Sequence, residues 1–271
     1  ENLISQGWES FEPYGSGKNY LENWNFDGDM KIWSGVKKTE KNTVIVVRGW
    51  NLRQRNLNIP KGNYIIRAKY RSLDEHSRHR LRLDFSGENS AEPRISYSEW
   101  RTGQDWNVVE WEVSMTEDSP NADAIFLSGL ESDKTWDRME INWLQITSVE
   151  NQHLVVEKTP LENGLTRIQT WGGSADMKLK SPNFGQLAET GTDMTISLYV
   201  ENNSDSMIRF SNNLAIGGAL YPDGVEYMIT VPREYKGFAY LKGELVGRDV
   251  ELDIRSDGNI DMIVSQPEII E

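Results

Sequence analysis

The chain of 271 residues has no cysteine, which excludes a disulfide framework, thiolate zinc ligands and a cysteine nucleophile. No hydrophobic run approaches the roughly 18 residues that a membrane-spanning helix needs. Basic side chains are in deficit, with 29 Lys and Arg against 42 Asp and Glu and a formal net charge of −13. This balance disfavours nucleic acid as a partner, because phosphate contacts need a net basic surface. The start, Glu1-Asn2-Leu3-Ile4, resembles neither a signal peptide nor a native Met start, so we expect a fragment or a processed product.

Catalytic motifs are also scarce. The sequence has no HExxH zinc motif, no Gly-x-Ser-x-Gly nucleophile elbow and no P-loop. His76 and His79 fall in a polar stretch between predicted strands and His153 falls in a polar link, so we interpret all three as solvated loop residues. Paired carboxylates for glycoside hydrolysis need only spatial proximity, and the sequence leaves that chemistry open. We predict a protein without enzymatic activity of its own.

Short segments with a period of about two residues dominate the chain. They are rich in β-branched and aromatic residues, and turn signals such as Pro60-Lys61-Gly62 and Ser119-Pro120-Asn121 separate them. The predicted strands cover residues 43–48, 63–71, 80–85, 108–115, 124–127, 139–146, 194–200, 207–210, 226–231, 238–241, 250–254 and 261–264. No stretch of ten or more residues carries a helical stripe. The spacing of about 8–12 residues between strands is typical of a sandwich or barrel.

The composition changes near residues 147–163, where a polar link with Thr159-Pro160 and Asn163-Gly164 interrupts the strands. Nine of the ten tryptophans come before residue 150, whereas strand-like segments continue after it. The order of segments in the two halves is also similar, which indicates a weak internal repeat. We therefore predict an all-β protein of two tandem antiparallel jelly-roll β-sandwiches, with boundaries at residues 1–149 and 150–271.

Tryptophans near polar residues are the first candidates for ligand contact. Sugar rings have apolar C–H faces that stack on flat aromatic rings, and their hydroxyl groups need polar partners nearby. Trp111 alternates with Val109 and Val113 and is expected to face the core. The candidates are the tryptophans at strand ends or among polar neighbours: Trp24, Trp33, Trp50, Trp100 and Trp136. The alternative is that each of them packs in the core or at its rim.

Basic residues on the outward faces of two predicted strands are the second candidates. Arg67 and Lys69 alternate with apolar residues on the strand at 63–71, and Arg80 and Arg82 do so on the strand at 80–85. A net-acidic chain that concentrates arginine in this way is suited to an anionic ligand, because guanidinium groups match carboxylate and phosphate. The alternative is a solvated face that glutamates on neighbouring strands neutralise, Glu110 among them.

A family resemblance rests on the order of several segments. The opening Asn2-Leu3-Ile4-Ser5-Gln6-Gly7 with Glu9 resembles the start of carbohydrate-binding-module-like jelly rolls. Trp33, the segment Pro60-Lys61-Gly62-Asn63-Tyr64, Trp106 and the closing strand at 139–146 follow in the same order as in that family. The end of the second half, from Met262 to Glu271, is similar to the closing strand of jelly-roll domains in tail and baseplate proteins of phages that infect Gram-positive bacteria.

The resemblance implies a virion protein of the phage tail or baseplate that is extracellular and binds a saccharide of the host cell wall. Its expected partners are that polysaccharide and other baseplate or tail proteins, without membrane insertion. It also implies a structural calcium ion, with Glu9 and Asn142 at the matching ligand positions of the first unit. Asn142 stands where the family usually has Asp, which removes a charge from a hard-cation site. The alternatives are an ancillary module or catalytic fragment of a polysaccharide-degrading enzyme, and a purely structural baseplate domain.

Overall fold

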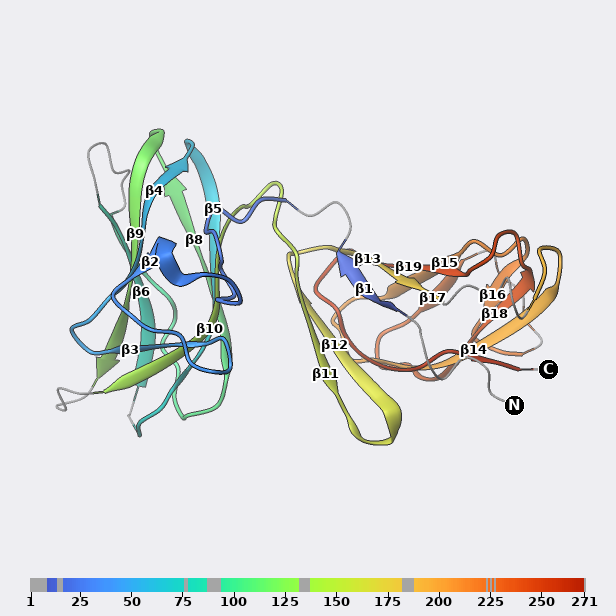
Figure 1. Cartoon of the computed structure of the whole chain (residues 1–271). Coiled ribbons are helices and arrows are strands. Elements are labelled where there is room, and N and C mark those ends of the chain that lie inside the picture. Colours follow the sequence, from blue (N-terminus) through green and yellow to red (C-terminus); the bar gives the residue numbers. More distant parts are fainter. Residues whose placement is uncertain are drawn as a thin grey trace. The chain divides into compact units, whose positions relative to one another are not determined.

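The structure is a computed structural model that describes residues 9–13, 17–75, 78–86, 94–131, 137–181, 188–222, 224, 226 and 228–270. The chain divides into two compact units, an N-terminal unit spanning Gly17–His153 and a C-terminal unit that contains Leu154–Glu271 together with the first strand. Each unit has two sheets around its own hydrophobic core, and every strand pair is antiparallel (Figure 1). The predicted fold class, all-β with tandem antiparallel β-sandwiches, is confirmed.

The N-terminal unit has a four-stranded and a five-stranded sheet. The four-stranded sheet consists, in spatial order, of β3 (Val44–Val47), β10 (Arg138–Ser148), β5 (Gly62–Ser72) and β8 (Asn107–Met115). The five-stranded sheet consists of β2 (Trp33–Ser34), β4 (Leu52–Ile59), β9 (Ser119–Glu131), β6 (Arg78–Ser86) and β7 (Ile95–Tyr97). The consecutive strands β5 and β6 thus belong to different sheets.

Alternation of side chains builds the core between these two sheets. In β5, Ile66, Ala68 and Tyr70 are buried in the core, and in β6 Leu81 and Leu83 are buried against them. The residues between them point to the outside of the sandwich, because successive side chains of a strand point to opposite faces. The outward residues of β5 and of β6 therefore lie on opposite sides of the unit.

The C-terminal unit also has two sheets. One consists of β1 (Glu9–Pro13), β13 (Ala175–Lys180), β19 (Glu251–Ser256), β15 (Ile208–Asn212) and β17 (Ile229–Val231). The other consists of β11 (Val155–Pro160), β12 (Leu165–Trp171), β20 (Asp261–Ser265), β14 (Asp193–Asn202), β18 (Lys236–Glu244) and β16 (Gly217–Ala219), and β21 (Glu268–Ile269) pairs with β14.

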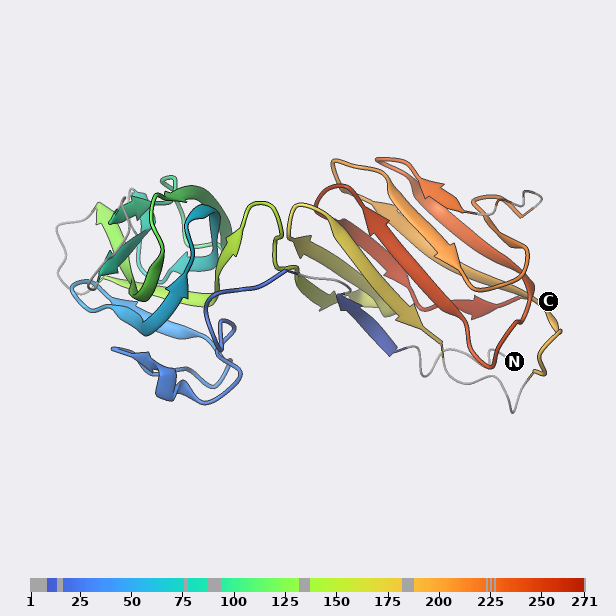
Figure 2. The same cartoon turned by 90° about the horizontal axis from the view of Figure 1, so that it is seen from above.

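The first strand is the main departure from the predicted boundaries. β1 pairs with the edge strand β13 of the C-terminal unit, with Glu9 opposite Lys180 and Pro13 opposite Met177 (Figure 2). The prediction that residues 1–149 form one unit is therefore wrong at its start. The reason is that strand pairing uses backbone groups that every residue carries, so the sequence of β1 does not reveal which edge it joins.

Helical structure among the described residues is confined to two single-turn 3-10 segments, η1 (Met30–Ile32) and η2 (Glu162–Gly164). Asp29 caps η1 by accepting a hydrogen bond from the backbone N–H of Lys31. Within the described part of the chain, no helix has the length and apolar character required to cross a bilayer.

Candidate functional site

The outer face of β6 and β7 carries alternating arginine and aromatic side chains, which we call the ladder: Arg78, Trp100, Arg80, Tyr97 and Arg82. The three arginines occupy alternate positions of β6, so all three point away from the core. The β6–β7 pairing places Tyr97 directly opposite Arg82. An isolated bridge between His79 and Arg101 brings Trp100 beside the start of β6.

Distances within the ladder are those of stacked cation–aromatic pairs. The guanidinium carbon of Arg80 lies 3.7 Å from the centre of the Tyr97 ring and 4.3 Å from that of Trp100. Arg78 lies 4.9 Å from the Trp100 ring centre, and Arg82 lies 5.9 Å from that of Tyr97. Each such pair contributes about 0.5–1 kcal/mol at an exposed site, so the ladder orders its own side chains before any ligand arrives.

Arg80 depends on a glycine in the neighbouring strand. Gly129 of β9 lies directly opposite Arg80, and a Cβ atom at Gly129 would lie 3.0 Å from Arg80 Cγ. The missing side chain at Gly129 therefore leaves room for the stem of Arg80. The Nε atom of Arg80 is buried and has no hydrogen-bond partner among the residues that the structure describes.

Arg82 is held by a carboxylate on its own strand. Its Nε and Nη2 atoms donate to Asp84 at 2.6 and 2.7 Å. These hydrogen bonds raise the pKa of the Arg82 guanidinium above its ordinary value, so Arg82 stays charged. Arg82 therefore fixes one end of the ladder, and Arg78 at the other end is exposed.

A second cation–aromatic cluster lies on the opposite outer face of the N-terminal unit. Trp106 is 37% exposed, and the charged groups of Arg71 and Lys69 lie 4.8 and 5.8 Å from its ring centre. Arg71 also pairs with Glu140 of β10 at 2.6 Å. The predicted basic set of Arg67, Lys69, Arg80 and Arg82 is thus not one site, because β5 and β6 belong to different sheets.

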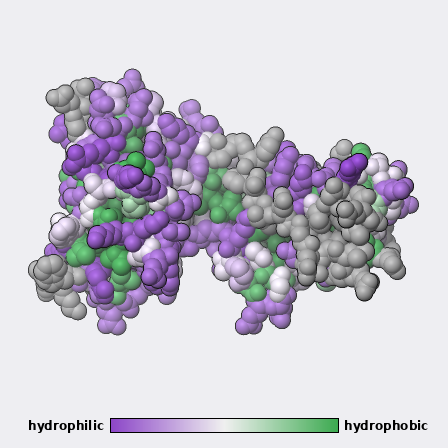
Figure 3. Space-filling view, in the orientation of Figure 1, coloured by the Kyte–Doolittle hydropathy of each residue, from purple (hydrophilic) through white to green (hydrophobic). Residues whose placement is uncertain are grey.

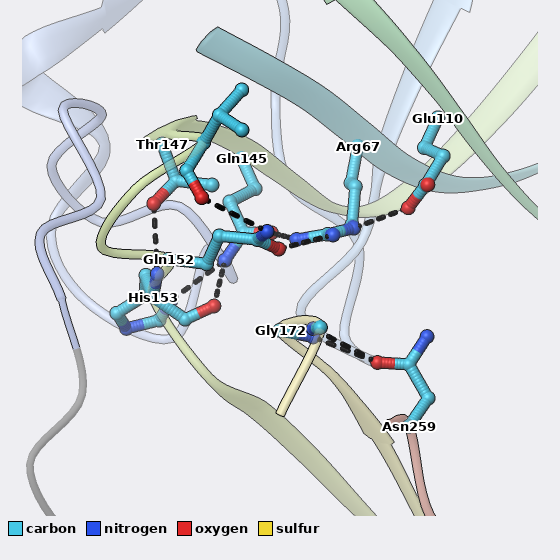
Figure 4. Close-up of polar contacts among 10 residues, drawn as sticks. Arg67, Glu110, Gln145, Thr147, Gln152, His153, Gly172 and Asn259 are labelled. Atoms are coloured by element: carbon cyan, nitrogen blue, oxygen red, sulfur yellow. Dashed lines mark hydrogen bonds and ion pairs between the residues drawn. The ribbon is translucent and has the colours of Figure 1, made fainter. Parts of the chain in front are cut away.

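Arg67 is a structural residue, and its predicted role in ligand binding is wrong. Its side chain is 2% exposed and donates from Nε to Glu110, from Nη1 to Gln145 and from Nη2 to Gln152, with donor–acceptor distances of 2.6, 3.1 and 2.5 Å (Figure 4). Glu110 is the directly opposed residue on β8. The alternative reading of cross-strand neutralisation is therefore confirmed for Arg67, because a fully buried guanidinium group needs all its donors satisfied.

Residues that end the N-terminal unit cover Arg67. Gln145 donates from Nε2 to the carbonyl oxygen of His153 at 2.7 Å and contacts His153 Nδ1 at 2.9 Å (Figure 4). The backbone N–H of His153 donates to Thr147 Oγ1 at 2.7 Å. We call this network, formed by Arg67, Glu110, Gln145, Thr147, Gln152 and His153, the Arg67 network. Its members anchor the end of the unit to the outer face of the four-stranded sheet.

The predicted tryptophans divide among different environments. Trp33 is 5% exposed and packs edge-to-face on Phe26, so the core alternative is confirmed for it. Trp24 is partly buried, packs on the same core and contacts the ring of His153 edge-to-face. Trp50, at a turn after β3, is 60% exposed, and Trp100 belongs to the ladder. Trp136 lies outside the described residues.

The prediction of solvated loop histidines fails for His79, whereas His153 does lie in the link between strands, where it is partly buried. His79 lies within β6, is fully buried, and contacts the hydroxyl group of Tyr70 at 3.1 Å and the carbonyl oxygen of Gly103 at 2.8 Å. His153 is partly buried within the Arg67 network, and burial lowers its pKa below the ordinary value. Both residues are therefore packing elements. His76 lies outside the described residues.

The predicted calcium ligands do not belong to one unit. Glu9 lies in β1 of the C-terminal unit, whereas Asn142 lies in β10 of the N-terminal unit. The register between β10 and β5 shifts between Ile141 and Trp143, so Asn142 is the extra residue of a β-bulge. Among the residues that the structure describes, no group of three or more His, Asp or Glu side chains is arranged to hold a metal ion. Calcium binding stays a prediction that rests on the resemblance alone.

The ladder combines two kinds of recognition chemistry. Guanidinium groups donate planar pairs of hydrogen bonds to carboxylate, sulfate or phosphate, and aromatic rings offer apolar surface to the C–H faces of a sugar. Among the residues coloured in Figure 3, hydrophilic ones predominate, with hydrophobic areas among them. Sequence reasoning found Trp100, Arg80 and Arg82 but missed Tyr97, because only the β6–β7 pairing places this ring beside the arginines.

Comparisons with known proteins identify neither a family nor a close relative. No family model matches the chain, and no curated protein matches it. Among solved structures, the N-terminal CBM22-1–CBM22-2 tandem domain of Xyn10C from Paenibacillus barcinonensis is similar at 10% identity, with a TM-score of 0.38, covering 94% of this chain and 98% of that one. A protein of Parabacteroides distasonis is similar at 8% identity, with a TM-score of 0.26, covering 99% of this chain and 98% of that one.

Proposed function

We propose that the chain is a non-catalytic carbohydrate-binding protein and that the ladder on the N-terminal unit binds an acidic glycan. The observation that carries the proposal is the stacking of Arg80 between Tyr97 and Trp100, flanked by Arg78 and Arg82, on the outer face of β6. The chain has a formal net charge of −13, so a clustered positive face is a local exception to its composition.

The ladder is ordered in a way that suits repeated sugar units. Successive outward positions of a strand lie about 7 Å apart, since each residue adds about 3.3 Å. A polysaccharide chain that lies along β6 would therefore meet the guanidinium group of Arg80 with Tyr97 and Trp100 beside it. The rings of Tyr97 and Trp100 hold this group in place, which reduces the entropy lost when a ligand binds.

Binding of polygalacturonate to the full chain tests the proposal. We expect Arg80→Gln to weaken this binding about tenfold or more, because charged hydrogen bonds contribute about 1.5–3 kcal/mol. Arg55→Gln is the matched control, since Arg55 is an exposed arginine of β4 in the same sheet and lies outside the ladder. Isothermal titration calorimetry at fixed salt measures both variants.

The carboxyl-reduced form of the same polymer separates charge from ring stacking. We expect the wild-type chain to bind this neutral derivative at least tenfold more weakly, because it retains the sugar rings but lacks the carboxylates. Equal affinity for the two polymers, or unchanged binding of Arg80→Gln, would contradict an acidic glycan as the ligand of the ladder.

A narrower proposal follows from the sequence resemblance. The glycan would be a cell-wall polysaccharide of a Gram-positive host, and the chain would act in the virion as a phage tail or baseplate adhesion protein beside other such proteins. Multiple copies on one particle would convert weak single-site binding into useful avidity. Fluorescently labelled chain should then stain host cells and leave non-host cells unstained, and Arg80→Gln should lose this staining.

The rival function is an enzyme that degrades a polysaccharide, or a module of one. It predicts release of reducing ends from polygalacturonate or from purified host polysaccharide. Turnover that disappears after substitution of a single carboxylate would exclude the non-catalytic proposal. A purely structural role predicts that ladder variants leave both polymer binding and cell staining unchanged.

A further inference from the structure

The outer face of the larger sheet in the C-terminal unit carries three neighbouring aromatic rings. Tyr199 of β14 lies directly opposite Phe238 of β18, and their ring centres are 5.6 Å apart. Tyr240 follows on β18, with its ring centre 6.4 Å from that of Phe238. The residues between them, Leu198 and Ala239 among others, are buried in the core, so the three rings point outward.

Two of these rings, Tyr199 and Phe238, border a groove of about 350 Å³ whose other lining residues come from β12, β14, β20, β21 and η2. Phe238 and Tyr199 form one wall, and Leu165 of β12 and Ser265 of β20 continue it across the sheet. Ser197 and Glu268 add polar groups at its side, and Asn163 adds an amide at its end. This volume lies at the lower end of the roughly 300–1,000 Å³ range of small-molecule sites.

Phe238 is the most informative residue of the groove. Its side chain is 50% exposed, whereas the residues that follow it in β18, from Ala239 to Gly243, are buried or partly buried. An exposed phenylalanine beside two tyrosines adds little to folding, because much of its apolar surface stays in water. The hydroxyl group of Tyr199 donates to Glu201 at 2.7 Å, which fixes the orientation of this ring beside Phe238.

The groove differs from the ladder in its charged groups. Its described lining residues include the carboxylate of Glu268 and no basic side chain. An acidic sugar would therefore find no cationic partner among them, whereas the hydroxyl groups of an uncharged sugar can exchange hydrogen bonds with the side chains of Ser197 and Asn163. The Ser265 hydroxyl group is already engaged, because it accepts from the backbone N–H of Tyr199 and donates to the carbonyl oxygen of Gln266. Flat rings, hydroxyl partners and a lining without basic side chains together favour an uncharged ligand.

We propose that this groove, built by Tyr199, Phe238, Ser197, Ser265 and Glu268, is a second glycan-binding site that takes an uncharged pyranose unit. The pyranose ring stacks its C–H face on Phe238, and its hydroxyl groups meet Ser197 and Asn163. The site lies in the C-terminal unit and uses none of the ladder residues. The experiments can therefore contradict this proposal without contradicting the acidic-glycan proposal for the N-terminal unit, and the reverse also holds.

Calorimetric titration of the full chain with neutral hexasaccharides tests the site. The panel has β-glucosyl, β-mannosyl, β-galactosyl and α-glucosyl backbones, each tested up to about 10 mM. We expect at least one to bind, Phe238→Ala to lower that affinity about tenfold or more, and Phe238→Tyr to retain it, because the ring provides the contact. Tyr221→Ala is the matched control, since Tyr221 is a 70% exposed aromatic residue outside the groove.

Arg80→Gln separates this proposal from the previous one. It should leave the affinity for the neutral hexasaccharide unchanged, and Phe238→Ala should leave polygalacturonate binding unchanged. Far-UV circular dichroism and thermal unfolding establish that each variant is folded, and Phe238→Gln provides a second ring deletion if Phe238→Ala unfolds.

Four results would overturn the second site. Three come from calorimetry: a lack of binding by all four hexasaccharides, equal binding by the wild-type chain and a folded ring-deletion variant, and stronger binding of galacturonate oligomers than of neutral ones at this groove. The fourth comes from sedimentation velocity. If Phe238→Ala converts a dimer into a monomer, the groove is an interface between copies of the chain and the proposal is wrong.

Discussion

At the residue scale, the environment of an arginine decides what it can do. Arg67 is buried with three side-chain acceptors around its guanidinium group, so its charge is used within the fold. Arg80 lies between two rings, and its Nε has no hydrogen-bond partner among the described residues. Both arginines occupy outward positions, one in β5 and the other in the next strand of the sequence, β6. The two differ in whether another segment of the chain covers the guanidinium group.

Replacement of Gly129 by alanine tests how Arg80 is positioned. The new Cβ atom would lie 3.0 Å from Arg80 Cγ and 3.3 Å from its carbonyl oxygen, so the Arg80 side chain has to move. We expect polygalacturonate binding to weaken about tenfold, while the free energy of unfolding changes by about 1 kcal/mol or less. Calorimetry and urea unfolding measure the two effects.

Gly247→Ala is the matched control, because a Cβ atom at Gly247 meets no atom within 4 Å. It should leave both quantities unchanged. Wild-type affinity in a folded Gly129→Ala variant would show that the position of Arg80 between the rings does not matter for binding.

At the scale of elements, the end of the N-terminal unit is anchored by side chains rather than by strand pairing. Gln152 reaches Arg67, and both the ring and the backbone of His153 contact Gln145. Gly17 contributes from the other end of the unit, where its backbone N–H donates to the carbonyl oxygen of Gln152 at 3.0 Å. A Cβ atom at Gly17 would lie 2.0 Å from the carbonyl oxygen of Asn151, so only glycine permits this approach.

The Arg67 network predicts a loss of stability in acid. Burial lowers the pKa of His153, so the unfolded chain binds a proton at higher pH than the folded chain does. The contribution of neutral His153 is therefore complete above about pH 6.5 and is lost as the pH falls below that value. Protonated Nδ1 would also become a donor and could no longer face the amide nitrogen of Gln145, 2.9 Å away.

Urea unfolding between pH 5 and pH 8 measures this effect. We expect His153→Asn, which keeps a short acceptor and cannot be protonated, to flatten the pH dependence relative to wild type. Tryptophan fluorescence is a suitable signal, since most of the tryptophans belong to the N-terminal unit. Identical pH profiles for the two proteins would contradict a role of His153 in stability.

The strand β1 gives a second prediction at this scale. Removal of residues 1–16 leaves the edge of β13 without its partner, because β1 is the terminal strand of that sheet. We expect the C-terminal unit to lose about 2 kcal/mol or more of stability, while the N-terminal unit keeps its own. Circular dichroism should report the earlier unfolding step clearly and tryptophan fluorescence only weakly, because Trp171 is the one tryptophan of the C-terminal unit that the truncated chain retains. Simultaneous loss of both signals would show that β1 stabilises both units.

At the scale of the whole molecule, two separate cores make each unit a candidate for independent folding. The N-terminal core draws on residues within Gly17–His153, and the C-terminal core draws on Leu154–Val264. The ladder belongs to the first unit and the aromatic groove to the second.

Expression of residues 17–153 alone tests this independence. We expect a cooperative thermal transition and polygalacturonate affinity close to that of the full chain. A shorter piece that ends at residue 149 should be less stable by about 1–3 kcal/mol, because it lacks the acceptors that Gln152 and His153 provide to Arg67 and Gln145. Equal stability of the two pieces would mean that the Arg67 network does not contribute to folding.

The predicted strands correspond to elements of both sandwiches, because a period of two with β-branched residues leaves few alternatives to a half-buried strand. The segments that were missed are more polar, as in β4 with its sequence LRQRNLNI and β13 with ADMKLK. In the site, alternation identified Arg80 and Arg82, and a polar neighbourhood identified Trp100. Neither signal identified Tyr97, which reaches the ladder through strand pairing.

The sequence by itself determined the fold class and the outward direction of the arginines, since both follow from local alternation along single strands. Only the tertiary structure decided that β5 and β6 lie in different sheets, that Arg67 is covered, and that β1 joins the second unit. These outcomes depend on which segments meet in space, and backbone pairing and burial between distant segments leave no local pattern in the residues that they join.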